Sequence, residues 1–345
     1  MLIKALKNTD FQHPSHQSHG IERTNTMIFL NQSDIFSISR AHVQSAVEDA
    51  YRVLVSENFN MPDRIHVHDR GNTLLLMPCF SEKYFATKLV SVFPKAWQHQ
   101  MPVVNGMLVL CDNTTGRPLS VMDGAAITAQ RTGAVGGLAV KYLSRDDLQT
   151  AGIFGAGIQG CFQARYLLSN RAINTLYIHD HKPELADKMA RMIENEFAGV
   201  SCRVEQDPET VIRSSELVIC ATTSPTPVFE LEDLQTGPAI YIGIGSFQPD
   251  MQEFPDAVTR MAEKVYVDTA FAVEESGDLK KPIEKGLLPQ DKIELFASIV
   301  DAGQPVTGKP VFFKSVGMAL FDLTVAAMVY EAAREQGLGQ SLKQD

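Results

Sequence analysis

Eight residues, Ile153-Phe154-Gly155-Ala156-Gly157-Ile158-Gln159-Gly160, join an apolar strand to a helix that starts at Cys161 through a GxGxxG turn. In such a turn Gly155 allows the tight bend, Gly157 lets the backbone approach a pyrophosphate, and Gly160 lets helix and strand pack closely. The free amides at the positive end of the helix attract the diphosphate. The turn therefore predicts a Rossmann-type dinucleotide site, with Ile158 and Gln159 beside the cofactor.

An acidic residue follows where this site needs one. Asp180 lies 20 positions after Gly160, at the end of the strand 175–179, and would accept hydrogen bonds from the adenosine ribose. A carboxylate there repels a 2′-phosphate and favours NAD over NADP, but His181 and Lys182 partly offset that repulsion. We expect NADH or NADPH, with NAD slightly favoured. Thr222 and Ser224 end the fourth strand and either face the cofactor or form an ordinary polar strand end.

Composition restricts the class of protein. The 345 residues suit two domains, and a formal net charge of −10 argues against nucleic acid or anionic membrane as partners. Five scattered cysteines without a CxxC pair indicate neither disulfides nor a zinc site, and favour a cytoplasmic protein with reduced, buried thiols. Residues 1–26 are polar, lack a signal-peptide apolar core and predict a disordered extension.

The hydrophobic period changes along the chain. Between 27 and 144, one amphipathic helix (41–56), a Gly- and Ala-rich helix (124–142) and alternating strands predict an α+β unit. From 145 to 310, short apolar runs alternate with helices, which is typical of a parallel sheet covered on both faces. The segment 311–345 is expected to return to the first unit. The predicted fold is α/β, with a Rossmann domain (145–310) inserted into a two-part substrate-binding and dimerisation domain (27–144 and 311–345).

Three cations outside the dinucleotide segment stand in unusual settings. Lys88 interrupts an apolar strand, Arg131 lies in a helix of small residues, and Arg64 follows a Met-Pro-Asp turn. Buried charges need partners, and structural ion pairs explain any one of these cations but explain all three less well. An anionic small molecule is the shared partner that we expect.

Several motifs together resemble the ornithine cyclodeaminase/mu-crystallin family. The resemblance runs from Met27 to about Ala333 and rests on Leu76-Met77-Pro78, residues 88–94, Ile127-Thr128 with Arg131-Thr132, the glycine turn and residues 313–317. It implies a homodimer with a substrate pocket in the two-part domain. It also implies that Arg64, Lys88 and Arg131 bind the carboxylate of an amino or imino acid, that Thr132 lies near the cofactor phosphates, and that Ser315, Val316 and Gly317 lie beside the nicotinamide.

Two departures from the cyclodeaminase pattern indicate the substrate. Where cyclodeaminases carry a substrate-contacting Glu and a catalytic Asp, this chain has Leu75 and Phe247. The stretch 245–253 instead resembles family members that reduce the cyclic imino acids Δ1-pyrroline-2-carboxylate and its six-membered homologue, whose rings suit an apolar pocket. Ornithine cyclodeamination, alanine-type dehydrogenation and non-catalytic ligand binding are the alternatives.

Other polar residues have less definite roles. Lys88 either assists proton placement on the imine nitrogen or only binds the carboxylate. Asp322 either anchors its helix or reaches the site. His66 and His68 share a strand face without a third ligand, so no metal is expected. Asp250 and Glu253 are expected at the solvated start of a helix.

Overall fold

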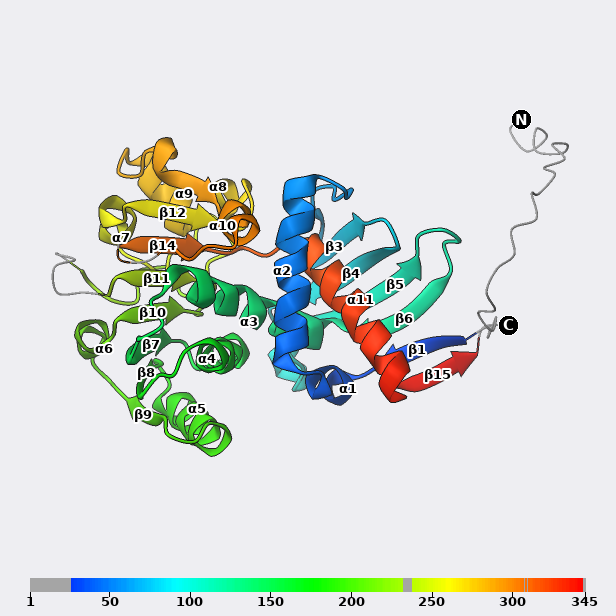
Figure 1. Ribbon diagram of the computed structural model, residues 1–345, viewed down its shortest axis with the longest axis horizontal. Helices are drawn as coiled ribbons and strands as arrows, with labels where there is room; N and C mark the ends of the chain where they lie inside the picture. The colour runs from blue at the N-terminus through cyan, green and yellow to red at the C-terminus, as the bar shows by residue number, and fades with distance from the viewer. Residues whose placement is uncertain (1–25, 232–237, 307, 309, 344–345) are drawn as a thin grey trace, which may run out of the picture.

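The computed structural model describes residues 26–231, 238–306, 308 and 310–343, and the extension expected over 1–26 lies outside them except for Thr26. The chain forms two lobes, each built on its own sheet (Figure 1). The first strand begins at Thr26.

The first lobe contains a seven-stranded sheet that is antiparallel except where the strand Thr26–Leu30 pairs in parallel with the strand Pro118–Asp123. Residues 112–118 join two neighbouring strands as a hairpin. In spatial order the strands are β15 (Gln340–Lys343), β1 (Thr26–Leu30), β6 (Pro118–Asp123), β5 (Val104–Asp112), β4 (Tyr84–Val92), β3 (Asn72–Phe80) and β2 (Ile65–Asp69).

The second lobe contains an eight-stranded sheet in which every described pairing is parallel, as the continuous apolar runs predicted. In spatial order the strands are β13 (Ile293–Leu295), β12 (Lys264–Val267), β14 (Val311–Lys314), β11 (Ile240–Gly243), β10 (Leu217–Cys220), β7 (Thr150–Phe154), β8 (Thr175–His179) and β9 (Ser201–Val204).

The position of β14 corrects the expected return to the first lobe at residue 311. Val311–Lys314 pairs with β11 on one side and β12 on the other, so it belongs to the dinucleotide sheet. A short apolar strand does not reveal which of two sheets it joins, and Pro310 marked only the end of a loop. The chain crosses to the first lobe after Lys314, along the turn 315–318 that leads into the helix Ala319–Gln336.

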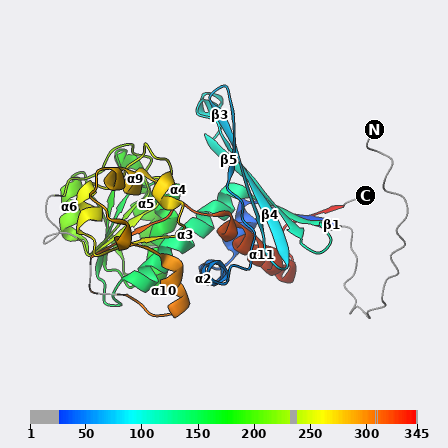
Figure 2. The same ribbon diagram turned by 90° about the horizontal axis from the view of Figure 1, so that it is seen from above.

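Helices cover both faces of the parallel sheet but only one face of the other sheet (Figures 1 and 2). The helices are α1 (Gln32–Ser37), α2 (Arg40–Ser56), α3 (Gly124–Leu143), α4 (Ile158–Asn170), α5 (Pro183–Glu196), α6 (Pro208–Ser214), α7 (Asp256–Met261), α8 (Ala272–Glu275), α9 (Gly277–Glu284), α10 (Phe296–Ala302) and α11 (Ala319–Gln336), with 3-10 turns η1 (Ala96–His99) and η3 (Gln290–Lys292).

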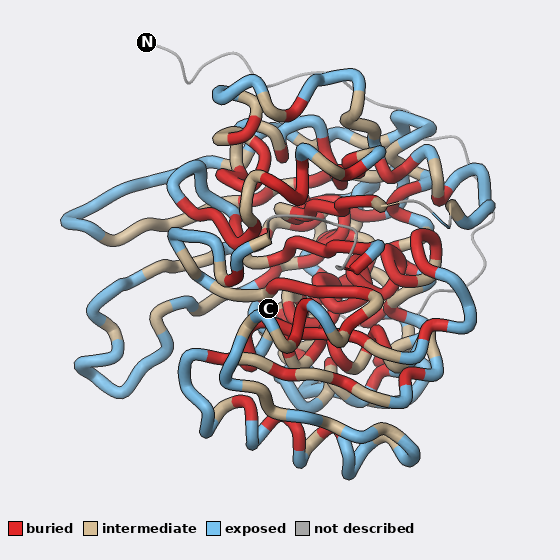
Figure 3. Tube along the Cα trace, turned by 90° about the vertical axis from the view of Figure 1, so that its left-hand side faces the viewer, coloured by how far each residue is buried: buried red, intermediate tan, exposed pale blue. Residues whose placement is uncertain are grey.

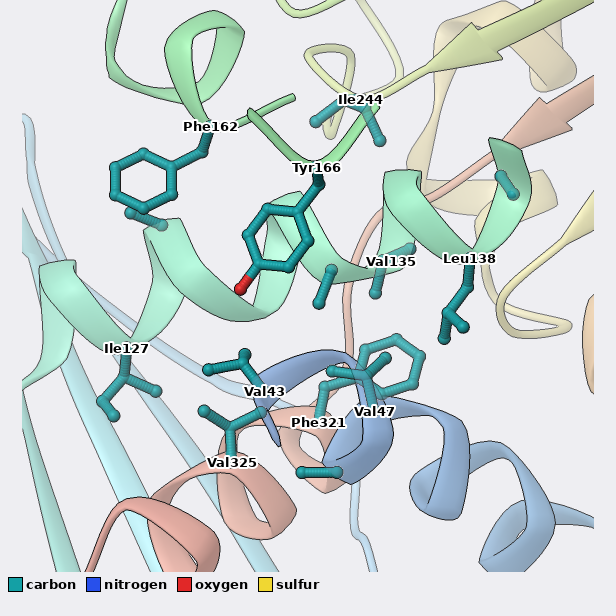
Figure 4. Packing of buried hydrophobic residues seen from close by; sticks show 14 of the residues in the cluster. Val43, Val47, Ile127, Val135, Leu138, Phe162, Tyr166, Ile244, Phe321 and Val325 are labelled. Carbon is teal, nitrogen blue, oxygen red and sulfur yellow. The ribbon is translucent and has the colours of Figure 1, made fainter. Parts of the chain in front are cut away.

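Helix α3 joins the two lobes, and its small residues explain how. A side chain at Gly136 would collide with Gln163 of α4, and one at Gly133 would meet the ring of Tyr166. Tyr166 lies across α3 and donates a hydrogen bond to Gln130 at 2.8 Å (Figure 4). The small residues of α3 thus allow close packing, which holds the first lobe against the dinucleotide sheet.

Burial follows this arrangement, with the buried trace in the centre and exposed residues on outer loops (Figure 3). Among the described residues, no helix has the length and apolarity that crossing a bilayer requires. All five cysteines are free thiols. Burial raises the pKa of Cys79 to about 12, which keeps that thiol protonated and unreactive.

Candidate active site

The glycine turn has the backbone geometry that its sequence predicts. Gly155 adopts φ +95°, where a Cβ would lie 2.7 Å from the Ala221 carbonyl oxygen, and a Cβ at Gly160 would collide with the Gly155 carbonyl. Gly157 is the N-cap of α4 and faces open space, since a Cβ there would have no neighbour within 4 Å. No side chain caps this helix, so its first amides are open to a ligand.

The side chains of Asp180, Ile158 and Gln159 lie next to the glycine turn. The Asp180 carboxylate accepts hydrogen bonds from the backbone amides of Ala156 at 2.7 Å and Lys182 at 2.8 Å, and lies 3.1 Å from Nδ1 of His181. These bonds fix the carboxylate beside the glycine turn. Ile158 is 69% exposed, and Oε1 of Gln159 is buried without a hydrogen-bond partner among the described residues. An unpartnered buried acceptor beside an open turn suits a ligand that donates hydrogen bonds.

The strand end at Thr222 is held by a residue whose expected position was wrong. Glu253 is fully buried before α7, rather than solvated at a helix start. Its carboxylate accepts hydrogen bonds from the amide and hydroxyl of Thr222 at 2.6 and 2.9 Å, and from the amides of Gly245 and Ser246 at 2.7 and 2.9 Å. One buried carboxylate thus joins the loops that follow β10 and β11.

Beneath these loops, Lys314 forms a buried ion cluster with Glu253 and Asp278. Its Nζ lies 3.0 Å from Asp278 and 3.9 Å from Glu253, and all three side chains are inaccessible to solvent. Asp278 also accepts hydrogen bonds from the amides of Glu253 and Phe254 at 2.7 and 3.0 Å. We call these three residues the Lys314 cluster.

Across the gap between the lobes, two of the three expected cations meet one carboxylate. Asp322 on α11 lies 2.8 Å from Nζ of Lys88 on β4 and 3.1 Å from Nε of Arg131 on α3. All three side chains are buried. Lys88 also donates to the Thr128 hydroxyl at 3.2 Å. Asp322 therefore contacts two of the residues that were predicted to bind the substrate, and we call Lys88, Arg131 and Asp322 the Lys88 cluster.

Gly317 links this cluster to the third cation. At φ +75°, a Cβ on Gly317 would collide with Nη1 of Arg131, so the guanidinium lies directly against the glycine. The carbonyl oxygen of Gly317 accepts a hydrogen bond from Nη2 of Arg64 at 3.0 Å. Arg131 donates to Asp322 through Nε, and among the described residues its two Nη groups have no hydrogen-bond acceptor.

A cleft of about 270 Å³ opens beside Gly317. Its walls come from both lobes and include Arg64, His66 and Met77 from the first and Phe271 and Glu275 from the second. Leu75 shares a face of β3 with Met77 and pairs with His66, but it is not among the lining residues. Phe247, 47% exposed after β11, does not line the cleft either.

Burial lowers the pKa values of two basic groups at or near the cleft. Removal from water lowers the pKa of Lys88 from 10.5 to about 8, with Arg131 and Arg64 adding to the shift while Asp322 opposes it. The pKa of His66 is also lowered, by burial and then by Arg64 and His68. No group of three potential metal ligands occurs among the described residues.

Two carboxylates in this region were not identified from the sequence. Asp268 is fully buried at the end of β12 and accepts hydrogen bonds from the Ser315 hydroxyl at 2.6 Å and the amides of Val316 and Gly317 at 3.0 and 2.8 Å. It holds the turn that presents Gly317. Glu275 ends α8 and lies 3.2 Å from Arg64. Their partners are distant in sequence, and no local pattern signals either role.

Comparisons with known proteins agree with this architecture. A profile of the ornithine cyclodeaminase/mu-crystallin family matches residues 25–337. A Δ1-pyrroline-2-carboxylate reductase of Bacillus cereus is 34% identical over 284 residues, covering 79% of this chain and 85% of that protein. An alanine dehydrogenase of Archaeoglobus fulgidus is 29% identical over 322 residues, covering 92% of this chain and 98% of that protein.

Solved structures are similar over nearly the whole chain. The Δ1-pyrroline-2-carboxylate reductase of Thermococcus litoralis, in complex with NADH and L-proline, has a TM-score of 0.84 and 30% identity, covering 91% of this chain and 99% of its own. An archaeal alanine dehydrogenase dimer with bound NAD has a TM-score of 0.84 and 27% identity, covering 93% and 100%. The chain therefore belongs to the ornithine cyclodeaminase/mu-crystallin family, with a Rossmann-type dinucleotide lobe.

Proposed function

We propose that this protein reduces Δ1-pyrroline-2-carboxylate to L-proline with NADH or NADPH, and that Δ1-piperideine-2-carboxylate is a second substrate to be tested. The observation that carries the proposal is the Lys88 cluster, in which two buried cations share one carboxylate and Arg131 lies against Gly317 in the wall of the cleft. This excess of positive charge suits a substrate carboxylate. The similar proteins from B. cereus and T. litoralis, named for this activity, support it.

The residues of the first lobe would bind the substrate. The two Nη groups of Arg131 are placed to bind a carboxylate, with Lys88 and Arg64 as additional cations. A protonated cyclic imine is already electrophilic at C2, so orientation and exclusion of water are the main tasks of the site. Leu75 and Phe247 stay proposed as apolar neighbours of the ring, although neither lines the cleft.

The second lobe fits a nicotinamide dinucleotide, which supplies the hydride when bound. The open amides after Gly157, the unpartnered Oε1 of Gln159 and the fixed Asp180 carboxylate carry this assignment. We assign the cofactor site to Gly155, Gly157, Ile158, Gln159, Gly160, Asp180, His181, Lys182, Thr222, Ser224, Thr132 and Val316. The repulsion of a 2′-phosphate by Asp180 favours NAD over NADP.

Lys88 could donate a proton to the substrate or only bind its carboxylate. With a pKa of about 8, it can donate a proton near the imine nitrogen at neutral pH, and its charged form can also bind the carboxylate. An arginine at position 88 keeps the second role but not the first, because its guanidinium stays protonated at every assay pH.

The direct test is a turnover assay. Purified protein, Δ1-pyrroline-2-carboxylate and NADH or NADPH should give loss of absorbance at the wavelength of the reduced cofactor, together with formation of L-proline. The absence of turnover with both cofactors would refute the proposal.

Alanine-type dehydrogenation is the second candidate, favoured by the length of the match to the A. fulgidus alanine dehydrogenase. It requires pyruvate and ammonium to consume NADH faster than the cyclic imine does. Ornithine cyclodeamination is disfavoured by Leu75 and Phe247 at the positions of its two carboxylates, and ammonia release from L-ornithine without net NADH formation would establish it.

We also propose a homodimer formed through the uncovered face of the seven-stranded sheet (Figure 2). Ile65, Leu89 and Met107 lie in one cross-strand row on that face and are 50%, 40% and 48% exposed. Such a row is typical of a protein interface. Light scattering should give the mass of a dimer for the wild-type protein and of a monomer for Leu89→Asp.

We also propose a cytoplasmic location, because the free thiols fit a reducing compartment.

A further inference from the structure

The outer end of the cleft holds a carboxylate that the proposed reaction does not use. Glu275 lines the cleft and lies 3.2 Å from Nη2 of Arg64, with 27% of its side chain exposed. It comes from α8 of the dinucleotide lobe, whereas Arg64 belongs to the first lobe. Asp63 lines the same end of the cleft.

The charges in the cleft are therefore unevenly distributed. At the inner end, marked by Gly317, the buried Lys88, Arg131 and Asp322 lie behind the lining residues and sum to one positive charge. At the outer end, Glu275 pairs with Arg64 and Asp63 adds a negative charge. The nearby buried Asp268 has three hydrogen-bond donors from residues 315–317 facing it.

We infer that Glu275 is a specificity-determining residue that restricts the cleft to imino acids with a single carboxylate. A first carboxylate at the inner end meets the excess positive charge. A second would lie near Glu275 and Asp63, where Arg64, the cation that both carboxylates would share, is already paired with Glu275. This inference rests on the proposed function and names the charge class of its substrate.

The ion pair has little other consequence for the protein. Pairs with this degree of exposure contribute little to the stability of a fold. Glu275 lies in the wall of the cleft, where its charge faces any ligand bound there. We therefore expect Glu275 to act mainly on which ligands the cleft binds.

Planar pyrrole carboxylates separate charge from size in an inhibition assay. The probes are pyrrole-2-carboxylate, pyrrole-2,4-dicarboxylate and the 4-methyl ester of the latter, which matches its size but carries one charge. In the wild-type protein, the dicarboxylate should inhibit cyclic-imine reduction about tenfold more weakly than its ester, as expected for like charges a few ångströms apart. In Glu275→Gln this gap should shrink to about threefold or less.

Glu274→Gln is the matched control. Glu274 lies on the same short helix but is exposed, with a surface ion pair to Lys280 at 3.5 Å. Its removal changes the protein's net charge by the same amount, so the wild-type gap should persist.

Several results would overturn the inference. They are equal inhibition by dicarboxylate and ester in the wild-type protein, no inhibition by either compound while pyrrole-2-carboxylate inhibits, or an unchanged gap in Glu275→Gln. Loss of cyclic-imine turnover in a folded, NADH-binding Glu275→Gln protein would also overturn it, because Glu275 would then act in the reaction. The wild-type comparison stands even if the variant does not fold, whereas a wild-type protein without turnover refutes the proposed function instead.

Discussion

The Lys88 cluster and the Lys314 cluster contain the same kinds of group in opposite proportions. Lys314 lies between two carboxylates, whose oxygens also accept hydrogen bonds from backbone amides. Asp322 lies between two cations, one of which has unused donors beside a cleft. The first arrangement is complete within the protein, and we propose that an anion completes the second.

This difference separates a structural role from a binding role. The Lys314 cluster joins the loops after β10 and β11, and its three side chains are inaccessible to solvent. The Lys88 cluster joins β4, α3 and α11 and faces the cleft through the Arg131–Gly317 contact. Burial of charge alone does not identify a site, but an unbalanced cluster beside a cleft does.

Arg131→Met should have the largest effect on activity. It removes the donors proposed for the substrate carboxylate, and loss of one partner of a buried, hydrogen-bonded charge pair between binding partners costs about 2–5 kcal/mol, roughly 10²–10⁴-fold in kcat/KM. Steady-state kinetics measure this, and NADH fluorescence should show nearly unchanged cofactor binding. A folded variant with unaltered kcat/KM would place the substrate elsewhere.

Lys314→Met and Lys88→Met should differ mainly in stability. Removing Lys314 leaves two buried carboxylates without their cation and should lower the free energy of unfolding by about 3–5 kcal/mol. Removing Lys88 leaves Asp322 paired with Arg131 and relieves a buried charge, so the change should stay within about 1 kcal/mol.

Urea titration of both proteins gives the comparison. Lys88→Met should keep the wild-type unfolding midpoint but lose activity, whereas Lys314→Met should unfold at a lower urea concentration. Equal destabilisation of the two variants would show that both clusters are structural.

The pH profile is the next test. Activity should fall about tenfold per pH unit above about pH 8, where Lys88 loses its proton, and Lys88→Arg should not show this fall. The same shift acts on stability with a defined sign. Between about 8 and 10.5 the unfolded chain binds more protons than the folded one, so the free energy of unfolding should rise with pH.

Calorimetry across this pH range measures the second effect. The rise should be absent from Lys88→Met. A wild-type profile without either change would mean that the pKa of Lys88 is not lowered.

The smallest effect is expected on cofactor choice. Asp180→Ser removes the charge that repels a 2′-phosphate but leaves His181 and Lys182 in place, so the NADH/NADPH ratio of kcat/KM should fall about tenfold. Parallel assays with both cofactors measure the ratio. An unchanged ratio would show that Asp180 acts only on the glycine turn, through Ala156.

The sequence predicted the features that depend on local patterns. The period of apolar residues predicted the parallel strands, and the glycines predicted the turn. Lys88 and Arg131 stood out because each is a single cation within an apolar or small-residue segment. Glu253 was misplaced because its neighbours Asp250 and Gln252 make the segment look solvated, while its partner Thr222 lies 31 residues away. β14 was misassigned for a related reason, since strand pairing is not visible in an apolar run.

Hydride transfer to C2 is the most direct test of the proposed reaction. Δ1-pyrroline-2-carboxylate should be reduced with NADH carrying deuterium at C4 of the nicotinamide, once for each face, and the product examined by mass spectrometry and NMR. The account predicts L-proline with one deuterium at C2 from one of the two labelled cofactors. Proline without deuterium from either cofactor, or no proline at all, would contradict it.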